Sequence, residues 1–189
     1  MFKKIITTFL IFTSFFSFQS VFAYDDKTTH PALTDEIIDF YNLSFSNKQL
    51  TPQQKEWIIE GSILEDTPPR WINHFYDPIN KIGWSGEYAG IYDKKTVQLI
   101  SENLIAPYNI VPVSSLEWMH NEQLQAKYAF YKGAKTWERG ILEIIKGNEK
   151  EGYKILGYIL HLLEDASVPD HTRNDTHAHE LEGMTGDYG

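Results

Sequence analysis

The sequence predicts an all-α fold, a compact multi-helix domain with long irregular loops. Apolar residues recur at helical spacing in several segments, whereas no segment alternates apolar and polar residues as a half-buried strand would. The pair Thr51-Pro52 places a capping residue before a proline, which is typical of a helix start. No internal repeat or low-complexity stretch argues for another architecture.

The N-terminal half of the domain is expected to contain two helices joined by a short connection. Residues 33–45 form the first, with Thr34 as a candidate cap. Its apolar positions are Ile37, Ile38, Phe40 and Tyr41. The second helix runs from Thr51 towards Asp66, and the prolines at 68 and 69 end that region. Residues 70–92 are rich in aromatic residues and glycine, which predicts a long ordered loop of the kind that is usually functional.

The C-terminal half is expected to be helical as well. Residues 94–103 form a short helix, and Ser115 caps a helical region that runs to about Ile145, with a break near Gly133 or Gly140. The last helix covers residues 150–167. Its apolar sides are formed by Leu156, Ile159, Leu160 and Leu163, and apolar residues on so many sides predict a buried helix.

The N-terminus has the pattern of a secretory signal peptide. Lys3 and Lys4 precede an apolar run over residues 5–18, and Val21-Phe22-Ala23 matches a small-residue cleavage site. The run is too short to span a membrane. We therefore expect residues 1–23 to be removed and residues 24–189 to form one domain of a secreted or periplasmic protein without a transmembrane segment. Loss of the two lysines takes the formal net charge from −9 to −11.

The composition excludes several kinds of site. The chain has no cysteine, so it carries no disulfide, no thiolate metal ligand and no lipoprotein anchor. Its excess of acidic residues disfavours simple electrostatic capture of nucleic acid, although bound metal ions would reverse the charge locally.

Residues 161–177 carry the densest group of metal-ligand side chains. His161 and Asp165 are four residues apart, so on a helix they share one face and can bind one ion. Pro169 is expected to end this helix, so that His171 and His177 follow from a loop. A plain hydrogen bond between His161 and Asp165 is the alternative. Metal binding is favoured because a charged group within apolar packing is costly unless it is paired or bound to a metal.

The pattern His161-x3-Asp165-x5-His171 with Pro169 resembles the zinc-dependent phospholipase C family, which shares its fold and trinuclear zinc centre with the fungal zinc-dependent single-strand nucleases. Further segments resemble motifs of the family in the same order along nearly the whole mature chain. They are Thr29-His30-Pro31-Ala32-Leu33-Thr34, Gly61-Ser62-Ile63-Leu64-Glu65-Asp66, Asn73-His74-Phe75-Tyr76-Asp77-Pro78 and Arg173-Asn174-Asp175-Thr176-His177. The helix motif is specific, whereas the Thr-His and Glu-Asp motifs gain force only from their order.

The resemblance implies up to three zinc ions. Asp66, His74, His161 and Asp165 would hold the first. Asp165 would bridge to a second ion, which His30 and the amino group and carbonyl of the mature N-terminus, Tyr24, would also bind. His171 and His177 would hold the third with a carboxylate that follows them, for which Glu182 is a candidate, and His179 is a rival to His177.

The chain departs from the family pattern at both ends. Family enzymes often begin with Trp where this chain has Tyr24, but a backbone ligand does not depend on the side chain. After His177 the candidate acids are Glu180 and Glu182, whereas in many family members the acid lies later, past a glycine-bearing loop that residues 183–189 resemble. The expectation is a C-terminally truncated chain in which this third site lacks its acid.

Other polar and aromatic residues have simpler interpretations. Glu65 is an alternative ligand to Asp66 and is otherwise an exposed helix acid, Asp77 suits a turn, and His120 suits packing or the surface. Arg173 could pair with a phosphate but is more simply a surface residue. Aromatic side chains that could wall a pocket, although core packing suits most of them, are Trp71, Phe75, Tyr76, Trp84 and Tyr88.

The function expected from this set is zinc-dependent hydrolysis of phosphodiesters, most simply by a phospholipase C that acts on phospholipid headgroups and contacts membrane surfaces transiently. Asp66 would serve as ligand, as general base or as both. The alternatives are a single-strand nuclease or nucleotidase with the same chemistry, and a zinc-binding chain without catalysis. No stable protein partner is expected.

Overall fold

The computed structural model describes residues 28–67, 70–84, 112–126 and 133–172, and within these ranges it is all-α, as predicted. The elements in chain order are α2 (Thr29–Ser44), α3 (Pro52–Glu65), the 3-10 helix η1 (Arg70–Asn73), α5 (Ser115–Trp118), α6 (Glu122–Ala126), α7 (Trp137–Ile145), α8 (Glu149–Asp165) and α9 (Pro169–Thr172). No strand occurs in the described ranges, where one isolated bridge joins Asp77 to Ile82. The expected helix 94–103 and the signal segment 1–23 lie outside these ranges.

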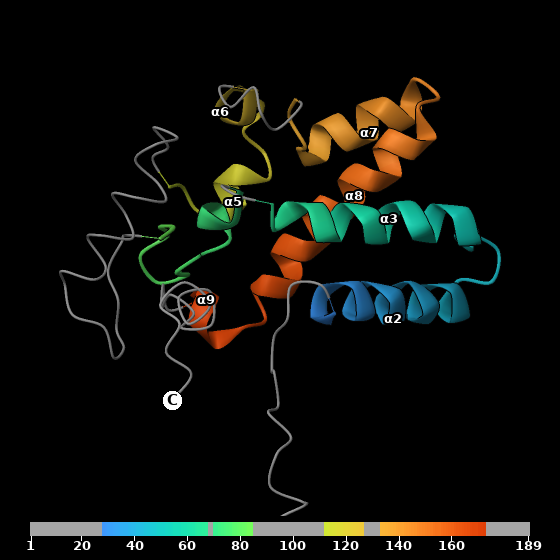
Figure 1. The fold of residues 1–189 in the computed structure, drawn as a ribbon, viewed down its shortest axis with the longest axis horizontal. Helices are drawn as coiled ribbons and strands as arrows, with labels where there is room; N and C mark the ends of the chain where they lie inside the picture. Colours follow the sequence, from blue (N-terminus) through green and yellow to red (C-terminus); the bar gives the residue numbers. More distant parts are fainter. Residues whose placement is uncertain (1–27, 68–69, 85–111, 127–132, 173–189) are drawn as a thin grey trace, which may run out of the picture.

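Helix α8 is the centre of the fold. It packs most extensively against α3 and also contacts α7 and α2, while α2 and α3 lie side by side (Figure 1). The main core cluster joins the second half of α8 to η1 and α5. Its buried members are Ile72, Phe75, Trp84, Trp118, Met119, Ile159 and Leu162. Of the apolar residues predicted to bury α8, Ile159 is buried, whereas Leu163 is 54% exposed.

Helix α3 begins as the sequence predicts. The Thr51 hydroxyl accepts a hydrogen bond from the Gln54 backbone N–H, and the Gln54 side chain accepts one from the Thr51 backbone N–H. This reciprocal capping box satisfies two of the backbone donors that a helix start leaves unpaired. The helix ends at Glu65, and Asp66 is its C-terminal flanking residue.

Helix α2 begins four residues earlier than predicted, and Thr34 is not its cap. Pro31 is tolerated in the first turn because the backbone N–H that it lacks has no partner there in any helix. Thr34 lies inside the helix, fully buried, and its hydroxyl bonds to Glu164. Of the four apolar residues expected to face the core, Ile38 alone is buried, and Phe40 is largely exposed.

The region between Ser115 and Ile145 is broken into shorter helices rather than being one long helix. Ser114, not Ser115, caps α5 by accepting a hydrogen bond from the backbone N–H of Glu117. The predicted break near Gly133 is confirmed, since this glycine has a positive φ of 95° and α7 starts only after Thr136. Gly140 lies within α7 and does not interrupt it.

Pro169 begins a helix instead of ending one. Helix α8 ends at Asp165, and Pro169 begins α9. The backbone N–H that proline lacks would have no partner in the first turn of a helix, so its absence costs nothing there. His171 therefore comes from a short helix and not from a loop as predicted.

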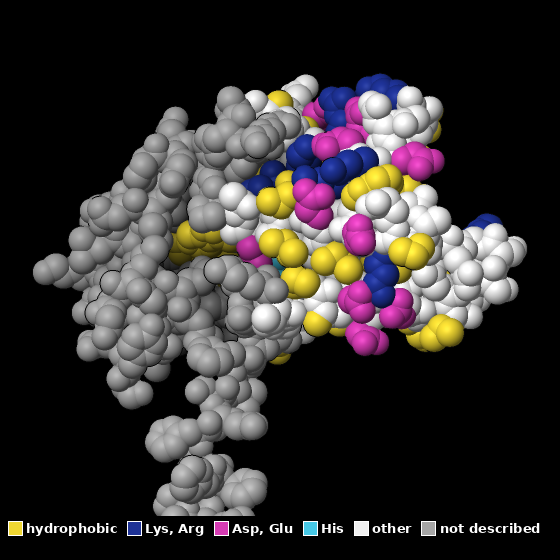
Figure 2. Space-filling model, turned by 45° about the vertical axis from the view of Figure 1, so that its right-hand side comes forward, with side chains coloured by type: hydrophobic (Ala, Val, Ile, Leu, Met, Phe, Trp, Pro, Cys, Tyr) yellow, Lys and Arg dark blue, Asp and Glu magenta, His cyan; other side chains and the backbone are white. Residues whose placement is uncertain are grey.

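Acidic, basic and hydrophobic side chains are interspersed on the face drawn in Figure 2, and almost no histidine surface is visible there. Within the described residues, no helix combines the length and the apolar character needed to cross a bilayer.

Candidate metal centre

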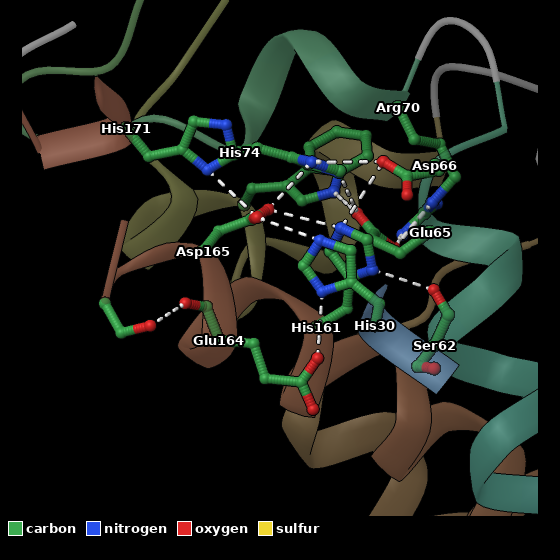
Figure 3. Close-up of polar contacts among 12 residues, drawn as sticks. His30, Ser62, Glu65, Asp66, Arg70, His74, His161, Glu164, Asp165 and His171 are labelled. Atoms are coloured by element: carbon green, nitrogen blue, oxygen red, sulfur yellow. Dashed lines mark hydrogen bonds and ion pairs between the residues drawn. The ribbon is translucent and has the colours of Figure 1, made fainter. Parts of the chain in front are cut away.

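Six of the predicted ligand residues meet at one buried point (Figure 3). Their side chains come from the first turn of α2, the end of α3, the segment after η1, the last turns of α8, and α9. They are His30, Asp66, His74, His161, Asp165 and His171. Tyr24, His177, His179, Glu180 and Glu182 lie outside the described residues.

Asp165 lies at the middle of this group and is 1% exposed. Its Oδ2 is 2.9 Å from His74 Nδ1 and 3.2 Å from His161 Nε2. Its Oδ1 is 2.9 Å from His171 Nδ1 and 3.3 Å from His30 Nε2. Each oxygen of one carboxylate therefore faces a different pair of imidazoles, which is the arrangement that a bridging ligand needs.

Asp66 completes one side of the cluster. Its Oδ1 lies 3.4 Å from His161 Nε2 and 3.6 Å from His74 Nδ1. Two groups of three residues have ligand atoms within 4.8 Å of one another, namely Asp66 with His74 and His161, and His30 with His161 and Asp165. The described residues thus offer two adjoining places for a metal ion.

Several buried atoms of the cluster make no hydrogen bond of acceptable geometry within the described part of the chain. They include both carboxylate oxygens of Asp165, Oδ2 of Asp66 and Nε2 of His161. His161 Nε2 lies 3.2 Å from Asp165 Oδ2, so a protonated His161 would pair directly with this carboxylate, which is the simpler alternative to a metal ion. A buried carboxylate costs on the order of several kcal/mol unless positive charge lies beside it. The donor set therefore fits a bound cation.

The orientation of the His161 ring points to the same conclusion. Its Nδ1 lies 2.8 Å from the backbone carbonyl of Ser62, which can only accept a hydrogen bond. Nδ1 must therefore carry a proton, and in the neutral imidazole Nε2 is left with its lone pair directed at Asp66 and Asp165. A lone pair that faces two carboxylates is repelled unless a positive charge lies between them.

In the metal-free protein, protons on the histidines supply the positive charge that the carboxylates need. Burial alone would lower the pKa of His74, but the facing carboxylate of Asp165, together with Glu65, raises it to about 9. Burial opposes charge on His161 too, yet Asp165 and Asp66 hold its pKa well above the usual value. The surrounding imidazoles hold the pKa of Asp165 well below its usual range, against the effect of burial.

Glu65, the alternative to Asp66, is fully buried rather than exposed, and its oxygens are already bonded. Oε2 accepts from Arg70 Nε at 2.8 Å and from Nη2 at 2.5 Å, and Oε1 accepts from Trp118 Nε1 at 2.9 Å. Oε1 also lies 3.7 Å from His74 Nε2, on the side of that ring away from Asp165. The geometry therefore favours Asp66 as the ligand and places Glu65 behind His74.

The remaining candidates have structural roles where the chain is described. Asp77 accepts hydrogen bonds from the backbone N–H groups of Ile79 and Asn80, which is a turn, and exposed His120 pairs with Glu138. Phe75 and Trp84 belong to the core cluster. Tyr88 and Arg173 lie outside the described residues.

Sequence reasoning did not identify the residues that surround the ligands. Glu164 and Thr34 contact His30 or its partner, and Ser62 contacts His161 through its backbone. Of these residues, Glu164 could have been suspected from the sequence, since it is an acid three residues after His161 on a helix predicted to be buried. The contact from Ser62 could not be inferred, because a backbone carbonyl leaves no trace in residue type.

Comparison of the chain with protein-family models, with curated proteins and with solved structures found no match. The geometry of the cluster and the sequence motifs therefore carry the functional argument.

Proposed function

We propose that this protein is a zinc-dependent phosphodiester hydrolase that acts as a phospholipase C on phospholipid headgroups. The observation that carries the proposal is the position of Asp165, whose two oxygens face His74 and His161 on one side and His30 and His171 on the other. Adjoining metal sites bridged by a carboxylate suit the displacement of a phosphoryl leaving group.

The donor set supports zinc. Imidazole nitrogens and carboxylate oxygens are ligands that zinc accepts, whereas calcium and magnesium prefer oxygen alone. Asp66, His74, His161 and Asp165 would hold one ion, and His30 and His171 lie where a second would share Asp165. Zinc bound there would supply a water of lowered pKa and would neutralise charge on a phosphate oxygen.

The chain's own residues would hold and activate the attacking water. Asp66 is the least buried carboxylate of the cluster, with its side chain 17% exposed, and Oδ2 makes no hydrogen bond in the described structure. Oδ2 is itself buried, so it would accept a proton from a water bound within the cluster, while Oδ1 faces His161 and His74. Asp66 therefore combines the roles of ligand and general base.

Two further observations support the substrate class. The motif His161-x3-Asp165-x5-His171 resembles that of the phospholipase C family, and the formal net charge of −9 disfavours a polyanionic nucleic acid relative to a zwitterionic lipid headgroup. Secretion belongs to the same proposal, because a signal peptide over residues 1–23 would expose the enzyme to lipid surfaces and free the amino group of Tyr24. Sequencing of the mature N-terminus tests that cleavage.

The test is an assay of the purified protein after chelation and after re-addition of zinc. Phosphatidylcholine vesicles and single-stranded DNA serve as parallel substrates, and metal content is measured on the same samples. We expect zinc-dependent release of phosphocholine and its loss in His161→Ala. His120→Ala is the matched control, because His120 is an exposed histidine outside the cluster.

Each outcome of this assay has a clear meaning. Zinc-dependent cleavage of DNA alone would replace the lipase proposal with the nuclease alternative. Zinc binding without hydrolysis of either substrate would favour a non-catalytic zinc protein. Unchanged hydrolysis after zinc removal would reject the metal-dependent mechanism altogether.

A further inference from the structure

Glu164 is a buried acid beside the candidate metal centre that the proposed reaction does not use. It lies next to Asp165 at the end of α8 and is 5% exposed. Its Oε2 is 2.9 Å from His30 Nδ1, and its Oε1 accepts a hydrogen bond from the Thr34 hydroxyl at 2.8 Å. Both contacts join α8 to the first turns of α2, more than a hundred residues earlier in the chain.

The contact with Glu164 determines which nitrogen of His30 carries its proton. A carboxylate accepts hydrogen bonds, so Nδ1 of His30 must donate. In the neutral ring the lone pair then resides on Nε2, which lies 3.3 Å from Asp165 Oδ1. The outer contact thus leaves a metal-binding lone pair directed at the centre.

We infer that Glu164 is a positioning residue, which holds the ring of His30 and its Nδ1-protonated form so that Nε2 can bind a metal ion shared with Asp165. The inference rests on the proposed metal centre and adds a residue to it. Carboxylates that accept a hydrogen bond from the outer nitrogen of a metal-bound histidine fix its orientation and increase its basicity.

The geometry separates this role from direct ligation by Glu164. Its two oxygens are taken up by His30 and Thr34, and its carboxylate lies on the side of the His30 ring away from Asp165 (Figure 3). Thr34 has a role of its own in the arrangement. It is fully buried one helical turn after His30, and it holds the second oxygen so that the first stays in line with Nδ1.

Metal affinity is the property that tests this role, measured by zinc competition with a chromogenic chelator on the purified full chain. We expect Glu164→Leu to weaken one class of zinc site by about 10- to 100-fold, as loss of an outer partner typically does. Glu164→Gln should lose much less zinc affinity. Its amide oxygen can still accept a hydrogen bond from His30, and its NH2 group can donate one to the Thr34 hydroxyl. Glu151→Leu is the control, since it removes a carboxylate from the same helix away from the centre.

A double-mutant cycle shows whether Glu164 acts through His30. If it does, adding Glu164→Leu to His30→Ala should change zinc affinity by less than about twofold, because the two residues act as one unit. Equal zinc affinity of Glu164→Leu and the unchanged protein, or additive losses in the double variant, would overturn the inference. A protein that binds no zinc before any substitution fails the proposed function instead, so the two failures are distinguishable.

Should Glu164→Leu not fold, Thr34→Val supplies an independent test. It removes the hydroxyl that holds Oε1 while keeping the volume of the side chain and the contact of Glu164 with His30. We expect Thr34→Val to weaken the same class of zinc site by less than Glu164→Leu would. An unchanged zinc affinity in Thr34→Val would contradict the role assigned to the pair.

Discussion

Asp165 is a carboxylate within reach of four imidazole rings, and its two oxygens make no ordinary hydrogen bond among the described residues. An arrangement of this kind is stable only if positive charge is supplied, either by protons on the histidines or by a metal ion. The two sources exclude each other, because a protonated imidazole cannot bind a metal. The charge of Asp165 would therefore be balanced either by histidine protons or by a bound metal ion.

Asp165→Asn tests this position with little change of volume. The amide is neutral and offers one oxygen instead of two, so both adjoining places for a metal lose their shared ligand. We expect zinc affinity to fall by more than about 100-fold, since loss of an outer partner alone costs about 10- to 100-fold. Chelator competition measures it, with Asp77→Asn as control because that exposed carboxylate serves a turn. Retention of full zinc affinity by Asp165→Asn would contradict the bridging role.

At the scale of elements, two glycines set the distance between α3 and α8. A methyl group on Gly157 would overlap the backbone carbonyl oxygen of Ile58, and one on Gly61 would overlap that of Lys154. The close approach has a consequence for the centre. It brings the carbonyl of Ser62, which follows Gly61, to 2.8 Å from Nδ1 of His161, one turn after Gly157.

Gly157→Ala should therefore destabilise the fold although alanine favours helix. Overpacking of helix against helix costs about 1–3 kcal/mol, which exceeds the gain of about 1 kcal/mol in helix propensity. Gly140→Ala is the comparison, because its methyl would meet the movable side chain of Ile155, 3.0 Å away, rather than backbone. Urea unfolding should show a clearly larger loss for Gly157→Ala. Equal changes in the free energy of unfolding would show that the helices separate freely.

The elements show which parts of the fold local sequence can predict. The start of α3 at Thr51-Pro52 depends on neighbouring residues, and it was predicted from the sequence. Pro169 was misinterpreted because proline suits the first turn of a helix as well as the end of one, and the choice depends on where α8 stops. Thr34 was misinterpreted because its hydroxyl bonds to Glu164, a residue distant in sequence.

At the scale of the molecule, the centre gathers side chains from segments between residues 30 and 171. The spacing of His161 and Asp165 could be predicted from helical geometry, and the order of the other motifs suggested which residues would join them. The geometry of the remaining pairs could not be predicted, because it depends on how α2, α3 and α8 pack. Since these contacts form only in the folded chain, a metal ion that binds there would stabilise the folded state.

Proton binding at the centre gives the metal-free protein a defined pH dependence. The pKa of His74 rises from 6.5 to about 9 on folding, so its contribution to stability is present below pH 6.5 and is lost as the pH rises through 9. His161 shifts in the same direction. Asp165 shifts downwards, so its contribution is present above pH 3.8 and is lost on acidification below that value. The metal-free protein should thus lose stability between pH 6.5 and 9.

Zinc should reverse this trend, because it needs the deprotonated histidines and replaces their protons as the source of positive charge. At pH 9 excess zinc competes with few protons, and zinc at 100 times its Kd would stabilise the fold by about 2.7 kcal/mol. At pH 6.5 protons occupy the same nitrogens, so the gain should be much smaller. Thermal unfolding at both pH values, with zinc and with chelator, measures the difference. His161→Ala should abolish most of the difference in zinc stabilisation between the two pH values, and His120→Ala should not. A zinc-induced shift in Tm that is equal at both pH values would show that the ion binds elsewhere.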